Sequence, residues 1–172
     1  MEPVEVSETL ALKPISRAAI PQALKKAEHY RLLGDPEQAE SICLDVLAAD
    51  PDNQAALVVV VLSMTDQFGR SGPPAVRLAK AYLGRLHDQY QREYYEGLVW
   101  EREGRVRLRQ SMGSTSAYES LRTAMACYER ASALRPADDD ESILRWNSCL
   151  RTIERADFRP RPAEREVEQP LE

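Results

Sequence analysis

The chain has 172 residues, of which 43% are hydrophobic and 30% are charged, proportions that are ordinary for a globular protein. Its net charge of −5 weighs against a dedicated nucleic-acid binder, because such proteins usually carry a basic excess. No run approaches the roughly 18 consecutive apolar residues that span a bilayer, so we expect no membrane association.

Proline and charged residues divide the chain into three predicted parts. Residues 1–15 are polar, acidic and interrupted by prolines, which predicts a flexible lead-in. Residues 16–156 are predicted to form a helical domain, because the chain holds only 7 glycines and few clusters of β-branched residues. Residues 157–172 are charged and proline-broken, which predicts a disordered tail.

The first helical hairpin is expected over residues 20–53. Its first helix covers about residues 20–33 and ends at Gly34. The second helix opens at Pro36, which suits a first helical turn, and it ends before Pro51, because proline disfavours helix in the residue before it.

The second hairpin is expected over residues 54–89. Its first helix, at about 54–68, is apolar on nearly all sides, which is typical of a helix buried in the middle of a packed structure. A loop over 69–74 and a helix over about 75–88, with Leu78 facing inward, complete the pair.

The third hairpin is expected over residues 90–138, with an insertion at about 105–116. Its first helix either ends near Gly104 or continues to about Gln110. The partner helix is expected over about 117–134 with Leu134 on its inward face.

In these spacings the chain resembles the tetratricopeptide repeat family over roughly residues 20–155. The first hairpin carries the resemblance at Ala27, Tyr30, Gly34, Asp35, Ala39, Val46, Asp50 and Pro51, with Tyr30 expected to fill the space between the helices. The third carries it at Gly97, Trp100, Gly104, Ala124, Tyr128, Ala131 and Pro136. The resemblance implies an all-α fold, a short right-handed α-solenoid of about three hairpins plus a C-terminal capping helix at 140–155.

In this family the first helix of each hairpin lines a concave groove that binds a peptide or a partner protein. Carried over, the resemblance implies groove positions at Leu24, Glu28, Arg31, Val58, Leu62, Thr65, Asp66, Tyr94, Leu98, Glu101 and Arg102. Two alternatives stay open. In the first, the apolar residues of this set belong to the hydrophobic core. In the second, the lead-in or the final helix fills the groove.

Some family members clamp the C-terminal carboxylate of a peptide with lysine, asparagine and arginine. The corresponding positions here are Leu24, Glu28, Val59, Gln91 and Tyr95, so this clamp is absent. An apolar groove with a mixed-charge rim would favour a hydrophobic or helical segment instead.

Residues suited to catalysis or metal binding are sparse. The two histidines, His29 and His87, are far apart in the sequence, and the chain has no CxxC spacing and no glycine-rich phosphate loop. We therefore expect no catalytic residue, no metal site and no cofactor. The three cysteines, Cys43, Cys127 and Cys149, are widely spaced, which favours buried thiols in a reducing compartment. The N-terminus also lacks the pattern of a secretory signal, so we expect a cytoplasmic protein.

Charged residues concentrate in the first helix of the third hairpin. Glu93, Glu96 and Glu101 are spaced for surface ion pairs with nearby arginines. If this helix continues, Arg102, Arg105 and Arg109 share one face. That face is either a site for an anion or an acidic partner, or a solvated face offset by the glutamates.

The sequence therefore predicts a non-catalytic protein–protein interaction module that binds a peptide or a partner protein, not nucleic acid. The main alternative is a structural assembly subunit whose apolar faces are buried in a homo- or hetero-oligomer. A more distant one is an accessory enzyme or a regulator of nucleic acid. The oligomeric state stays open.

Overall fold

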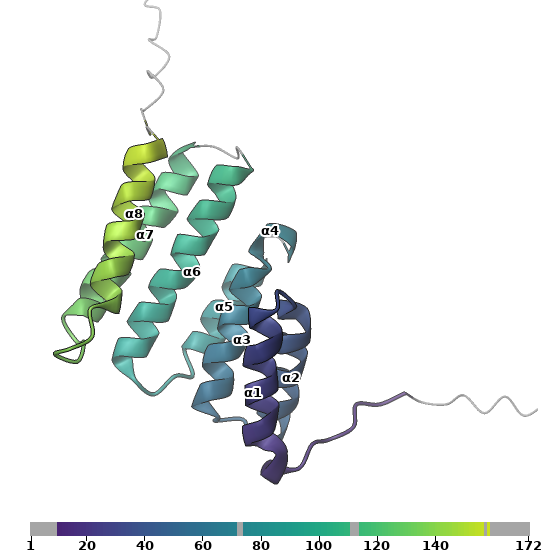
Figure 1. Cartoon of the computed structure of the whole chain (residues 1–172). Coiled ribbons are helices and arrows are strands. Elements are labelled where there is room, and N and C mark those ends of the chain that lie inside the picture. The colour runs from purple at the N-terminus through teal and green to yellow at the C-terminus, as the bar shows by residue number, and fades with distance from the viewer. Residues whose placement is uncertain (1–9, 72–73, 111–113, 157, 159–172) are drawn as a thin grey trace, which may run out of the picture.

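The chain folds as helices throughout the part that the structure, a computed structural model, describes: residues 10–71, 74–110, 114–156 and 158 (Figure 1). The all-α prediction is confirmed for these residues, which contain no strand. The elements are a 3₁₀ turn η1 (Arg17–Ala19), α1 (Ile20–Leu32), α2 (Pro36–Ala49), α3 (Gln54–Asp66), α4 (Phe68–Ser71), α5 (Pro74–Leu83), α6 (Gln89–Arg109), α7 (Ser114–Ser132) and α8 (Glu141–Ala156). In the described part of the chain, no helix has both the length and the apolar character needed to cross a membrane.

Local signals in the sequence explain where the helices begin. The side chains of Asp35, Asn53 and Asp88 each accept a hydrogen bond from a backbone N–H in the first turn of α2, α3 and α6, at 3.1, 3.0 and 2.7 Å. Gly34, with φ of 81°, adopts the left-handed conformation that ends α1, a conformation that glycine takes without steric cost. The turn predicted for the first hairpin therefore forms as expected.

Helices that follow each other in the chain pack against each other, with α3 contacting α5 across the short α4. In addition, α3 contacts both α1 and α6, so it lies beside each of them. The last helix, α8, packs on α7 at the side of the molecule away from α1 (Figure 1).

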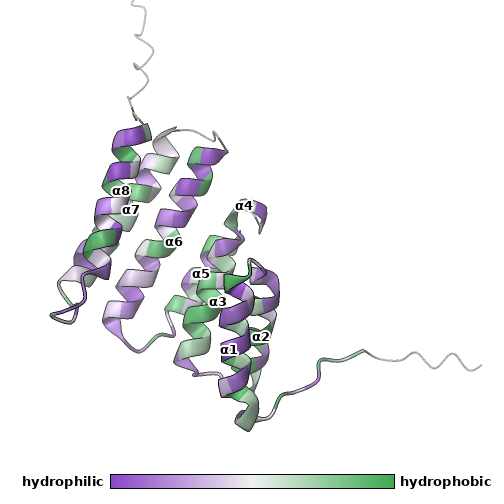
Figure 2. Ribbon diagram, viewed as in Figure 1, coloured by the Kyte–Doolittle hydropathy of each residue, from purple (hydrophilic) through white to green (hydrophobic). Residues whose placement is uncertain are grey.

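The core has two apolar clusters. The larger one lies among α1 to α5 and includes Val99 and Val106 of α6, and the second lies among α6, α7 and α8 around Leu121 and Tyr128. Helix α3 is hydrophobic along most of its length, whereas α1 and α8 alternate in character (Figure 2). Most of the α3 side chains are buried, as the sequence predicted for an all-round apolar helix.

The predicted insertion at 105–116 lengthens two helices. Helix α6 has 21 residues and runs to Arg109, so the second of the two predicted end points is the right one. Helix α7 has 19 residues and starts at Ser114, three residues before the predicted start. Residues 111–113 lie outside the described part of the chain. The extra residues therefore extend the α6–α7 contact.

Several local expectations were wrong. Residues 68–71, placed partly in a loop, form the short helix α4. Tyr30 does not fill the space between α1 and α2, because its side chain is 36% exposed. Leu78 and Leu134, expected to face inward, are also exposed. Apolar residues at three-to-four spacing define the buried face of a helix only to within about one position. Tyr30, Leu78 and Leu134 lie at the edge of that face.

Residues 10–15 have no regular structure. Leu12 to Ile15 border a small pocket beside α2 together with Asp45, Ala48 and Ala49, and of the four lead-in residues only Ile15 is partly buried. The rest of the predicted lead-in, residues 1–9, lies outside the described residues. So does the predicted tail apart from Phe158.

Replacing Gly97 with alanine is expected to destabilise the fold, because a Cβ atom there would lie 2.7 Å from Cε1 of Tyr128. Tyr128 is fully buried and cannot move aside, so we expect a loss of about 1–3 kcal/mol in the free energy of unfolding. Urea denaturation measures this loss. Gly69→Ala is the matched control, since an added Cβ there meets nothing within 4 Å, and equal losses for both variants would contradict the close α6–α7 approach.

Candidate functional site

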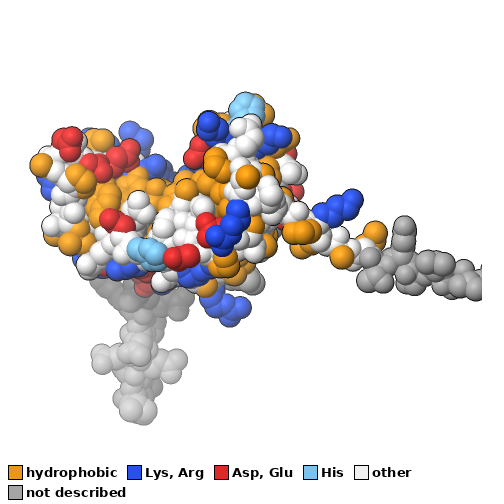
Figure 3. All heavy atoms as spheres, turned by 90° about the horizontal axis from the view of Figure 1, so that it is seen from below, with side chains coloured by type: hydrophobic (Ala, Val, Ile, Leu, Met, Phe, Trp, Pro, Cys, Tyr) orange, Lys and Arg blue, Asp and Glu red, His pale blue; other side chains and the backbone are white. Residues whose placement is uncertain are grey.

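An open groove of about 570 Å³ lies between α1, α3, α6 and α8. This volume is in the range of about 300–1,000 Å³ that is typical of ligand sites. Figure 3 shows the molecule hollowed between two raised sides, with hydrophobic side chains at the bottom of the hollow and charged side chains on both sides. The lining residues are Arg31, Leu62, Asp88, Tyr90, Gln91, Tyr94, Tyr95, Leu98, Arg102, Pro136, Asp139, Glu141 and Arg145.

Tyrosines of α6 form much of the groove surface. Tyr94 is at the centre of an aromatic group: its ring lies 5.9 Å from Tyr90, 5.1 Å from Tyr95 and 5.9 Å from the buried Tyr128. Offset and edge-on ring contacts at such distances are favourable. The buried Tyr128 thus supports the groove from below through Tyr94.

One side of the groove is basic, and its arginines form ion pairs that connect three helices. Nε of Arg31 on α1 lies 2.7 Å from a carboxylate oxygen of Asp66 on α3, and Arg102 on α6 pairs with the other oxygen. Arg102 also donates to the Thr65 hydroxyl at 2.7 Å. Burial lowers the pKa of the Arg102 guanidinium, and Asp66 opposes that shift.

A buried carboxylate lies under the groove. Glu101 on α6 is 2% exposed and accepts hydrogen bonds from the Tyr128 hydroxyl of α7 at 2.7 Å and from Nε of Arg105 at 3.0 Å. Arg145 of α8 lies 3.6 Å away, and Arg105 also donates to Ser148 of α8 at 3.0 Å. The sequence placed Glu101 at the surface, and the structure corrects this.

The opposite end of the groove is acidic. The Tyr90 hydroxyl donates to Asp139 at 2.9 Å and the Tyr94 hydroxyl donates to Glu141 at 2.7 Å. Burial, with the Glu141 hydrogen bond adding to it, raises the pKa of Tyr94 to about 12. Burial and the bond to Asp139 likewise raise the pKa of Tyr90. These hydroxyls therefore stay protonated donors at neutral pH.

Some of the predicted groove positions line this groove and others do not. Arg31, Leu62, Tyr94, Leu98 and Arg102 line it. The remaining positions fall into three groups by burial. Thr65 and Glu101 are buried, Leu24 and Val58 pack partly buried against the core, and Glu28 and Asp66 are exposed, Asp66 as the partner of the two arginines.

Half of the lining residues that the sequence did not predict come from the α7–α8 connection and α8, and the other half from Asp88 and the first two turns of α6. The final helix was assigned a capping role, so Pro136, Asp139, Glu141 and Arg145 were missed. The four-residue spacing of Tyr90 and Tyr94, which puts both on one helix face, was a signal that could have indicated an aromatic side to the site.

Neither predicted occupant fills the groove in the described part of the chain. Residues 12–15 of the lead-in border a separate pocket beside α2, and none of the described lead-in residues lines the groove. Helix α8 forms one side of the groove through Glu141 and Arg145.

The arginine face at Arg102, Arg105 and Arg109 stays a prediction with its two alternatives, and two of these side chains have carboxylate partners within the fold. Arg102 is drawn to Asp66 of α3, whereas Arg105 is drawn to Glu101 and to Ser148 of α8. Arg109 is exposed at the end of α6. Two of these arginines therefore already have carboxylate partners within the fold, in different directions.

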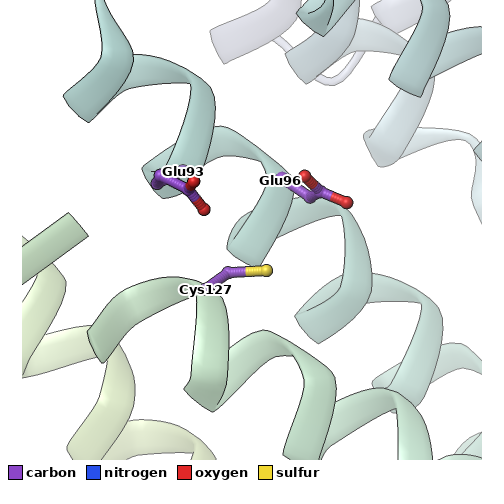
Figure 4. A group of neighbouring side chains, drawn as sticks. All are labelled: Glu93, Glu96 and Cys127. Atoms are coloured by element: carbon purple, nitrogen blue, oxygen red, sulfur yellow. The ribbon is translucent and has the colours of Figure 1, made fainter. Parts of the chain in front are cut away.

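Glu93 and Glu96 of α6 and Cys127 of the facing α7 have possible metal-binding atoms within 4.8 Å of one another (Figure 4). Each already has a cationic neighbour: Glu93 pairs with Arg130 at 2.8 Å, Glu96 with Lys80 at 3.0 Å, and Arg130 also donates to the Cys127 sulfur at 3.2 Å. Burial, with Glu96 adding to it, raises the pKa of Cys127 to about 11. Ion pairing between helices accounts for this group.

Comparison with protein-family models, with curated proteins and with solved structures found no match for this chain.

Replacing Glu101 with alanine is expected to destabilise the fold by about 3–5 kcal/mol, because it leaves Arg105 and Arg145 without their carboxylate and the buried Tyr128 hydroxyl without an acceptor. Tyr128→Phe removes only one hydrogen bond and is expected to cost about 1–3 kcal/mol. Urea denaturation gives both values. The exposed Glu154→Ala should stay within about 0.5 kcal/mol of the parent, and a similar result for Glu101→Ala would contradict the network.

The three cysteines are expected to resist thiol reagents in the folded protein. Cys43, Cys127 and Cys149 are free and buried, and burial is the main cause that raises the pKa of Cys43 and of Cys149 to about 12. The thiolate is the reactive form, so labelling at neutral pH should follow unfolding. Timed labelling with a chromogenic disulfide, with and without urea, measures this. Rapid labelling of any one cysteine in the folded protein would be inconsistent with its burial.

Proposed function

We propose that this chain is a non-catalytic interaction module of the tetratricopeptide type, a short right-handed α-solenoid that binds a segment of a partner protein in the groove between α1, α3, α6 and α8. The observation that carries the proposal is the groove lining. It draws on α1, α3, α6 and α8 and their connections, and on none of α2, α5 and α7. In the family that the sequence resembles, the first helix of each hairpin lines the binding surface.

The helix contacts support the repeat arrangement. Each of the first two hairpins places its leading helix against the leading helix of the next, α1 against α3 and α3 against α6. The close approach of α6 to α7 at Gly97 and Gly104 resembles the small-residue packing of the family's hairpins.

The chemistry of the lining supports a peptide as the ligand. Tyrosine and arginine are enriched where proteins bind one another, and tyrosine buries a large area with few rotatable bonds. The groove offers three tyrosines and three arginines beside Leu62 and Leu98. The groups best suited to nucleophilic or acid–base chemistry lie elsewhere, since the cysteines are buried and His29 and His87 are exposed away from this lining. Free thiols also support a reducing compartment such as the cytoplasm.

Selection of random twelve-residue peptides displayed on phage tests the groove. We expect peptides that bind the parent chain and lose binding to Leu62→Glu, because this change places a charge on the apolar floor. Leu44→Glu is the matched control, since Leu44 is an exposed leucine on α2, outside the groove. Circular dichroism checks that both variants keep their helices.

Two outcomes would contradict the proposal. One is a selection that yields no enriched peptide from the folded chain. The other is a set of peptides that bind Leu62→Glu as well as the parent, since binding would then occur on another surface.

A further inference from the structure

Charge is segregated along the groove. Its acidic residues, Asp88, Asp139 and Glu141, lie around the beginning of α6 and of α8. Arg31 and Arg102 lie towards the other end, where α6 faces the last turn of α3. Along α6 the two ends, from Asp88 to Arg102, are about 21 Å apart, at about 1.5 Å per residue.

The carboxylates of the acidic end are bonded to neutral donors. Asp139 accepts from the Tyr90 hydroxyl at 2.9 Å and from the backbone N–H of Glu141 at 2.9 Å. Glu141 accepts from the Tyr94 hydroxyl, and Asp88 from the backbone N–H of Gln91. Within the described residues none of the three carboxylates lies within 4.0 Å of a lysine or arginine nitrogen. None of the three therefore takes part in an ion pair within this part of the fold, although Asp88 and Asp139 accept from backbone N–H groups at the beginning of α6 and of α8.

The basic end has the opposite balance. Arg31 and Arg102 share the single carboxylate of Asp66, so two cations meet one anion there and leave a net positive charge. Arg145, the third arginine of the lining, follows Glu141 by one turn on α8 and pairs with the buried Glu101 at 3.6 Å, so it lies between the two ends. Between the two ends lie the side chains of Leu62, Tyr94 and Leu98.

We propose that the groove selects a partner segment with a lysine or arginine for the acidic end, an acidic side chain for the basic end, and an apolar side chain between them. Opposite charges on a partner would compensate both ends, and the tyrosine rings beside Asp139 and Glu141 would add a favourable surface for a cation. An extended segment of about six or seven residues covers the 21 Å between the ends. This proposal rests on the proposed function, because it specifies what the groove binds.

The peptides selected on the parent chain and lost with Leu62→Glu also test this proposal. We expect them to carry a basic and an acidic residue separated by about five positions with an apolar residue between. Fluorescence anisotropy with the synthetic, fluorescein-labelled peptides should show affinity about tenfold lower for the double variant Asp139→Asn, Glu141→Gln. Both changes remove charge and nearly keep the shape. Glu141→Gln keeps an oxygen for the Tyr94 hydroxyl, whereas Asp139→Asn keeps only one of the two hydrogen bonds that Asp139 accepts, from Tyr90 and from the backbone N–H of Glu141.

A double-mutant cycle separates a direct contact from a general charge effect. Replacing the peptide's basic residue with glutamine should weaken binding to the parent about tenfold and to the double variant less than about twofold. The matched control is Glu37→Gln with Glu154→Gln, which changes net charge equally at two exposed positions outside the groove and should leave affinity unchanged.

The possible results discriminate between the two proposals. The selected peptides could depend on Leu62, show no charge pattern and bind the double variant as tightly as the parent. This result would overturn the proposed charge selection but would still agree with peptide binding in the groove. Peptides that match a stretch of this chain would identify a second copy or the chain's own ends as the occupant, and would also overturn the charge selection. If no peptide is enriched, both proposals fail.

Discussion

The buried carboxylate of Glu101 is the constraint on which the C-terminal half of the molecule depends. A charge in the interior is costly unless it is paired and hydrogen-bonded. Glu101 meets that requirement with Tyr128 of α7, Arg105 of α6 and Arg145 of α8, so its stability requires the three helices to keep one relative arrangement. The same contact places Arg145 on the groove and holds Tyr128 beneath the groove tyrosines.

The next residue along α6 makes the corresponding connection to the N-terminal half. Arg102 points to Asp66 of α3, which also pairs with Arg31 of α1. Successive residues on a helix project about 100° apart, so one turn of α6 can contact α7 and α8 with one side chain and α1 and α3 with the next. Arg31 and Arg102 line the groove, so its basic end is formed by residues that also link α1, α3 and α6.

The sequence correctly predicted the features that depend on local helix signals and on apolar patterning. Gly34, Pro36 and Pro51 limit the first hairpin correctly, and the apolar pattern of α3 predicted its burial. The sequence left two alternatives for the end of α6 and placed the start of α7 three residues late, because the extra residues can extend a helix as easily as a loop and only the facing helix decides between them. The partners of the arginines could not be predicted for a related reason: helical spacing places Arg102 and Arg105 on one face, but Arg102 pairs with Asp66 of α3 and Arg105 with Glu101 of α6 itself. The acidic end of the groove was missed because Asp139 and Glu141 come close to Tyr90 and Tyr94 only through tertiary structure.

The two ends of the groove differ in how closely binding and folding are coupled. At the basic end the arginines already pair within the fold, so an acidic group of a ligand would share Arg31 and Arg102 with the carboxylate of Asp66. At the acidic end the carboxylates receive only neutral donors, so a cationic group could bind without breaking an existing ion pair. Tyr94 contributes both to the binding surface and to the packing of the fold, because it lines the groove and packs on the buried Tyr128. Leu62 and the carboxylates at the start of α8 are therefore the positions at which binding can be changed with the least effect on folding.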